Sequence, residues 1–145
     1  MTTQRPYLNA PTADGDQAVR ELIDHLQRGG ETGDADVYDG MFAADILWGT
    51  PKGMVLKDYS NLNPIHRRMM SGPPVVPISR FEPAQVSHPA PGVVVAQIRR
   101  SALDGGFSEM AMYVLVQHGG KWWVAAAQNT PVVDTLPGGV GSTVS

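Results

Sequence analysis

The hydrophobic residues of this chain change their spacing near its midpoint, and that change constrains the fold more than any other feature. In residues 16–26 apolar side chains recur every three or four positions, which is typical of an amphipathic helix. From about residue 78 onward they follow long runs that are divided by short turn sequences, HPAPG, DGG and GG. Helices followed by consecutive strands indicate an α+β fold with an antiparallel meander, rather than alternating βαβ units.

Three helices are expected before the meander. Asp16 and Asp34 are placed to cap the first two helices, and Asp58 starts the third. The pair Gly29–Gly30 should end the first helix. The expected elements are helices over residues 16–28, 34–42 and 58–70, and strands over residues 46–50, 54–56, 78–87, 93–103, 107–118 and 122–129.

The length and the ends of the chain indicate a single domain. A chain of 145 residues can bury a sizeable core without disulfides or metals. Residues 1–15 are polar, and residues 134–145 are rich in Gly, Ser and Thr. We therefore expect one domain over residues 16–133 with a tail on each side.

Composition excludes several classes of function. A net charge of −3 gives no electrostatic footprint for nucleic acid. Cysteine is absent, so disulfides and Cys-based zinc sites are excluded. The sequence has no apolar run of membrane-spanning length and no apolar signal-peptide core, so we expect a cytoplasmic protein that does not enter the membrane.

The meander is expected to form a homodimer. Both of its faces are too apolar to lie against water, and the helices can cover only one of them. Charged residues make up only 17% of the chain, which also favours a partly covered exterior.

A candidate ligand site follows from pairing the strands through their tight turns. If GG at 119–120 is a two-residue hairpin loop, Tyr113 lies opposite Ala126, and Gln128 shares that face. The DGG turn then adds Gln97 and Arg99 to the same face. Small Ala126 would leave a gap with polar groups around it, as a small-molecule site requires. The alternative is that Arg99 and the two glutamines lie on a solvated part of the sheet.

Proton-transfer candidates are few. His66 lies on the third expected helix and is the best general acid or base, unless it is merely packed or exposed. Asp45 could point into the pocket mouth, or could instead bond to backbone at a turn. Tyr38 and Trp48 are candidates for the pocket wall, with ordinary core packing as the alternative.

No cofactor or metal is expected. No two histidines have the spacing of metal ligands, and the chain lacks a strand–glycine loop–helix unit for a dinucleotide. The acidic run of Asp34, Asp36 and Asp39 is interpreted as charge at a helix N-terminus rather than as a cation site.

Three stretches resemble the NTF2-like superfamily, also called SnoaL-like or ketosteroid-isomerase-like, and within it the SgcJ/EcaC-type family. They are DADVYDGMFAADILWGTPKG at 34–53, VVVAQIRRSAL at 93–103 and GGKWWVAAAQNTPV at 119–132. With the helices they cover nearly all of residues 16–133. Lys57 stands where that family often has a second glycine before the third helix.

The resemblance implies a cone in which a curved sheet and helices enclose a pocket, and usually a dimer formed through the sheet. Members occur in natural-product clusters, including those for enediyne polyketides, so the implied ligand is an apolar polyketide-type intermediate. Relatives in the superfamily include isomerases, dehydratases, cyclases, epoxide hydrolases and non-catalytic association modules. An isomerase-, cyclase- or dehydratase-type enzyme without a cofactor and a non-catalytic binding or association module therefore both remain open.

Overall fold

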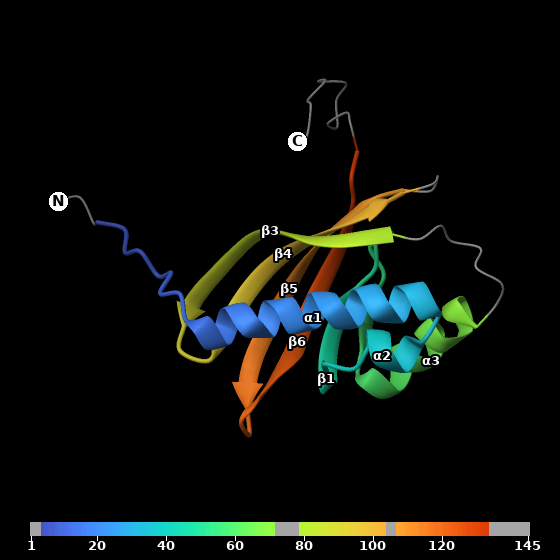
Figure 1. The fold of residues 1–145 in the computed structure, drawn as a ribbon, viewed down its shortest axis with the longest axis horizontal. Coiled ribbons are helices and arrows are strands. Elements are labelled where there is room, and N and C mark those ends of the chain that lie inside the picture. Colours follow the sequence, from blue (N-terminus) through green and yellow to red (C-terminus); the bar gives the residue numbers. More distant parts are fainter. Residues whose placement is uncertain (1–3, 72–78, 104–106, 134–145) are drawn as a thin grey trace.

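Three helices precede a curved six-stranded sheet, as expected for an α+β chain (Figure 1). The computed structural model describes residues 4–71, 79–103 and 107–133. The expected C-terminal tail lies outside these residues. The elements are α1 (Ala13–Thr32), α2 (Ala35–Tyr38), β1 (Phe42–Gly49), β2 (Val55–Lys57), α3 (Tyr59–Met70), β3 (Ser79–Ala90), β4 (Val93–Ala102), β5 (Glu109–His118) and β6 (Lys121–Pro131).

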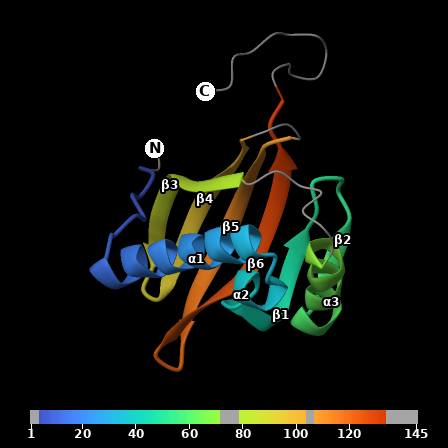
Figure 2. The ribbon, with the colours of Figure 1, turned by 45° about the vertical axis from the view of Figure 1, so that its right-hand side comes forward.

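The sheet has the strand order β2-β1-β6-β5-β4-β3. Strands β3 to β6 form the expected antiparallel meander, and β1 joins it by pairing in parallel with β6. Figures 1 and 2 show all three helices on the same side of the sheet, with α3 beside β1 and β2. We call the side under the helices the inner face and the opposite side the outer face. No helix in the described part of the chain is long and apolar enough to cross a membrane.

Helix α1 is longer at both ends than the sequence predicts. It is capped by Thr12, whose side chain accepts a hydrogen bond from the backbone of Gly15 at 3.0 Å. The expected stop at Gly29–Gly30 is wrong, because Gly29 lies under α2, where its missing side chain lets the two helices approach. The helix ends instead at Gly33, whose φ of 67° suits a left-handed cap.

Helix α2 is capped by Asp34 as predicted, but it ends four residues early. The Asp34 carboxylate accepts hydrogen bonds from the backbone of Asp36 and Val37. The helix stops at Tyr38, and Phe42, expected on the same helical stripe, begins β1. Strand β1 therefore starts four residues earlier than its expected first residue, Ile46.

A β-bulge in β6 changes the register that the turns predict. The two-residue turn is present, since Gly119 and Gly120 have φ of 60° and 77° and the pairing next to it follows the prediction. After Leu115 pairs with Val124, however, the next pair is Val114 with Ala126, so Ala125 is an extra residue. From that point every partner on β6 is shifted by one, which moves side chains to the other face.

The core lies between the inner face and the helices. Leu22 and Leu26 of α1 and Leu62 of α3 have at most 1% of their surface exposed. They pack in one cluster with side chains from the inner face, including Ile46, Trp48, Ile98, Tyr113, Leu115 and Val124. This packing holds the helices against the inner face. None of the described residues covers the outer face.

Two neighbouring glycines in α1 provide a matched test of this packing. A Cβ atom added at Gly29 would lie 2.5 Å from the backbone N of Tyr38, whereas one at Gly30 would meet only Phe81, at 3.8 Å. We predict that Gly29→Ala lowers the free energy of unfolding by about 1–3 kcal/mol through overpacking. Gly30→Ala should raise it by about 0.5–1 kcal/mol, because alanine is the better helix former. Urea unfolding of both variants measures this, and equal effects would show that α2 does not contact Gly29.

Candidate functional site

The ligand site predicted on one sheet face is divided between two faces. Tyr113 pairs with Ala96 and Ala127 and lies on the buried inner face. The bulge in β6 places Gln128 opposite Met112. Gln97 also pairs with Met112, because the β4–β5 register differs by one residue from the register inferred through the DGG turn. Both glutamines therefore lie on the outer face. The prediction that these side chains converge around Ala126 is therefore wrong.

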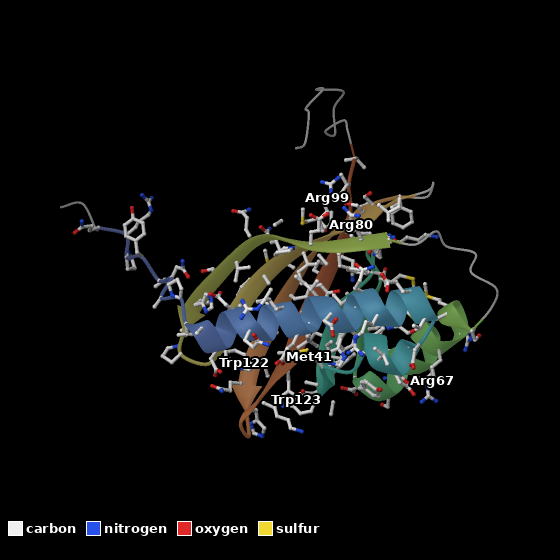
Figure 3. All side chains as sticks on the ribbon, viewed as in Figure 1. Met41, Arg67, Arg80, Arg99, Trp122 and Trp123 are labelled. Atoms are coloured by element: carbon white, nitrogen blue, oxygen red, sulfur yellow. The ribbon has the colours of Figure 1, made fainter. Side chains whose placement is uncertain are left out.

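Arg99 is also on the outer face. It pairs with Met110 and lies opposite Glu82 of β3, and its Nε donates to the Ser101 hydroxyl at 3.3 Å. Figure 3 shows Arg99 at the far end of the sheet from Trp122. Arg99 therefore cannot contact a ligand that lies beside Tyr113 on the inner face.

Ala126 does border an open space, but on the outer face. A hollow of about 470 Å³ lies there over β1, β2, β5 and β6. The lining is mainly apolar and comprises Leu47, Trp48, Gly49, Val55, Leu56, Lys57, Met112, Val114, Ala126, Ala127 and Gln128. Leu47 is 56% exposed, Val55 83% and Met112 43%, so this hollow is the centre of an apolar surface.

Asp45 does not reach either space. It lies within β1 rather than at a helix–strand junction, and its side chain is exposed. It does not line the hollow on the outer face or the small hollow on the inner face. The earlier start of β1 explains the difference, because the turn that was expected to hold Asp45 is part of a strand.

Trp48 of β1 and Tyr38 of α2 both pack among aromatic rings between the sheet and the helices. Trp48 packs against Phe42 with ring centroids 5.3 Å apart and against Tyr113 at 6.4 Å. Tyr38 contacts Phe42 and Phe81 edge-on. The small hollow on the inner face is lined by Tyr38 but by neither Trp48 nor His66, and its volume of about 10 Å³ has room for about one water molecule.

His66 of α3 points into this group of aromatic rings. Its ring centroid lies 5.4 Å from that of Tyr38 and 5.3 Å from that of Trp48. Its Nδ1 lies 2.6 Å from Oδ1 of Asp39, and only 9% of the imidazole and none of the Asp39 side chain is exposed. A buried carboxylate that is hydrogen-bonded to Nδ1 fixes the orientation of the imidazole. The other ring nitrogen, Nε2, then points away from the carboxylate.

Asp39 is the residue that the sequence interpretation missed. Asp34 does act at a helix N-terminus, but α2 is so short that Asp39 is its C-terminal cap. A negative charge there gains nothing from the helix dipole, which favours cations at that end. The signal in the sequence was the position of Asp39 among apolar neighbours, in YDGMF. An acidic residue in such a stretch is expected to be buried with a partner rather than exposed to solvent.

A second cluster of polar side chains lines the small hollow on the inner face, between Tyr38 and strands β4 and β5. The phenols of Tyr38 and Tyr113 both border the small hollow, and burial raises the pKa of both well above the ordinary value. Arg100 lies 3.1 Å from Glu109, and both line the small hollow with the two tyrosines. Arg100 faces the side opposite Arg99, because neighbouring side chains alternate along β4.

These groups suit proton transfer. The imidazole can accept a proton, and phenols that stay protonated can donate hydrogen bonds to a developing oxyanion. Within residues 4–71, 79–103 and 107–133, no three His, Asp or Glu side chains are grouped to hold a metal ion.

Comparison with known proteins identifies the fold but no family. No family model matches the chain, and no curated protein matches its sequence. The SgcJ/EcaC-type resemblance therefore stays a prediction.

Many solved structures share the fold. A domain of unknown function from Nostoc punctiforme has a TM-score of 0.72 at 15% identity, with 85% of this chain and 80% of that chain covered. An uncharacterised protein from Caulobacter vibrioides has a TM-score of 0.68 at 16% identity, covering 83% and 92%. An NTF2-like protein of unknown function from Pseudomonas putida has a TM-score of 0.67 at 17% identity, covering 91% and 96%. The first two are described as cystatin-like, and the chain has the α+β fold that these NTF2-like and cystatin-like proteins share.

Proposed function

We propose that the chain binds an uncharged, largely apolar small molecule against its inner face and moves a proton on it. The observation that carries this proposal is the buried pair of Asp39 and His66, 2.6 Å apart, beside the rings of Tyr38 and Trp48. A core that served only stability would gain more from apolar side chains at these two positions.

The proposed chemistry uses the two ends of the imidazole differently. Asp39 accepts the Nδ1 proton of His66, which leaves Nε2 free to take a proton from a carbon or oxygen atom of the ligand. For a ketone, the electron pair of the broken C–H bond moves onto the carbonyl oxygen. The phenol of Tyr38 stabilises that oxygen by a hydrogen bond, and the proton then returns from Nε2 to the product.

The charges on the inner face favour a ligand without a net charge. Arg100 is already paired with Glu109, and Asp39 with His66. Arg99, which was expected in the ligand site, lies on the outer face. Binding a charged molecule here would bury a charge with no partner, which is costly.

Binding also requires the inner face to open. The existing space of about 10 Å³ is far below the roughly 300–1,000 Å³ of typical ligand pockets. Tyr38 is the ring best placed to move, because it is only partly buried and α2 is a single turn. A polyketide-type ligand, implied by the family resemblance, remains a prediction.

Proton transfer can be tested with 2-tetralone, an uncharged bicyclic ketone with acidic C–H bonds. We predict that the protein accelerates exchange of these hydrogens for deuterium in D₂O, followed by proton NMR. His66→Gln should slow the catalysed exchange by at least tenfold, since a positioned general base contributes about 10²–10⁴-fold.

His118→Gln is the matched control, because His118 is an exposed histidine in the β5–β6 hairpin. Asp39→Asn is a second variant in case His66→Gln does not fold. Equal exchange rates for the native protein, a folded His66→Gln or Asp39→Asn variant and the control would refute the proposed chemistry.

Association through the outer face is the second candidate, and it can coexist with the first. The observation that favours it is the apolar hollow of about 470 Å³ with exposed Leu47, Val55 and Met112 around it. Contiguous apolar surface of this kind marks association sites more often than free surface. We propose a homodimer that buries this face.

The dimer can be tested with a charge placed in the hollow. We predict that the native chain sediments as a dimer at micromolar concentration and that Met112→Lys sediments as a folded monomer, because a lysine there would be buried unpaired. Gln85→Lys is the control, since Gln85 is exposed on the same face but does not line the hollow. A native chain that sediments as a monomer would exclude this association.

A further inference from the structure

A continuous series of hydrogen bonds joins the buried Asp39 to the surface of the molecule. Nδ2 of Asn63 donates to Oδ2 of Asp39 at 3.0 Å and to Oδ1 of Asp36 at 3.1 Å. Arg67 in turn grips Asp36 with two bonds, Nε to Oδ1 at 2.9 Å and a terminal nitrogen to Oδ2 at 2.7 Å. Figure 3 shows Arg67 at the outside of α3.

The spacing of α3 brings these groups together. Asn63, His66 and Arg67 stand at i, i+3 and i+4 of the helix, so all three face α2, which carries Asp36 and precedes Asp39. Asn63 and His66 are both buried, whereas Arg67 is exposed. The series therefore runs from solvent to the imidazole within one turn of helix.

The amide of Asn63 can make this bridge in only one orientation. Its two N–H groups each serve a carboxylate, and a flipped amide would present an oxygen to two negative charges. The two carboxylates repel one another, and the guanidinium of Arg67 offsets the charge on the outer one. Consistent with this, hydrogen bonds from Arg67 and then Asn63 lower the pKa of Asp36.

Asn63 also decides which way the Asp39 carboxylate faces. A carboxylate held only by His66 could rotate about its terminal bond and tilt its plane away from Nδ1. With Oδ2 bound by Asn63, Oδ1 is the oxygen that remains for His66. The geometry of the imidazole is then set by two partners rather than one.

We infer that Asn63 is a positioning residue that holds Asp39 so that the proton of neutral His66 stays on Nδ1, and that the exposed pair of Asp36 and Arg67 keeps Asn63 in place. The inference rests on the proposed function, in which Nε2 of His66 accepts the proton. It extends the site from a buried pair to five side chains, two of which, Asp36 and Arg67, are exposed and can be substituted at the surface.

The test is the tautomer of His66, read from long-range proton–nitrogen correlations in ¹⁵N-labelled protein. In the native chain we expect His66 with Nδ1 protonated and Nε2 unprotonated. Asn63→Leu keeps the size of the side chain but removes both donors, and should make the other tautomer measurable. Asn61→Leu, which changes an exposed asparagine two residues before Asn63 on the other side of α3, should not.

Two exposed arginines give a second comparison that does not disturb the core. Arg67→Gln should shift the ring-nitrogen signals of His66, while Arg68→Gln, at the neighbouring exposed arginine, should leave them in place. An unchanged tautomer in Asn63→Leu, or equal effects of the two arginine variants, would overturn the positioning role.

The outcome separates this inference from the function on which it rests. If the tautomer changes as expected but 2-tetralone exchange does not depend on His66, Asn63 still positions Asp39 and the proposed chemistry fails. If exchange depends on His66 but the tautomer does not change in Asn63→Leu, the positioning role is refuted and the proposed chemistry stands.

Discussion

The burial of one carboxylate organises the helical layer of this protein. Asp39 has no exposed side-chain surface, and a buried charge is tolerated only where hydrogen bonds and charged partners surround it. Both of its partners, Asn63 and His66, come from α3, so the need to satisfy Asp39 fixes α3 against the end of α2. Gly29 completes this arrangement by letting α1 pass close to α2. The imidazole consequently lies against the aromatic rings of the inner face instead of in solvent.

The sheet depends on a second constraint, the extra residue in β6. Ala125 shifts the pairing with β5 by one and so decides which side chains meet the helices. Tyr113, Ala127 and Asn129 thereby join the inner face, while Met112, Ala126 and Gln128 join the outer one. The small side chain of Ala127 lies directly opposite Tyr113, which gives this large ring room on a crowded face. The three alanines thus have different roles. Ala125 is the bulged residue, Ala126 lines the hollow on the outer face, and Ala127 pairs with Tyr113 on the inner face.

The sequence was sufficient to predict the elements because their signals are local. The capping by Asp34, the start of α3 after Asp58 and the glycine turn at 119–120 each depend on a few neighbouring residues. The bulge could not be predicted in the same way, since no residue type marks Ala125 as unpaired and a register follows from the partner strand. The extra residue at Ala125 moved Gln128 to the other face. A separate difference of one residue in the pairing of β4 with β5 moved Gln97 and Arg99.

The candidate site was predictable only in part for the same reason. His66 was identified because histidine is rare and titrates near neutral pH. Its partner was not, because the pairing joins positions 27 residues apart and depends on α2 ending at Tyr38. Tyr38 and Trp48 both pack against His66, but their role as a pocket wall stays a prediction.

A crystal structure of the chain soaked with 2-tetralone would test most directly whether the inner face is a ligand site. We predict density for the ketone between His66 and Tyr38, with the ring of Tyr38 displaced and the bond between Asp39 and His66 intact. Ketone density confined to the hollow on the outer face, with the rings around His66 still closed, would contradict this placement. The protein would then have to be understood as an association module whose buried pair serves only to hold α2 and α3 together.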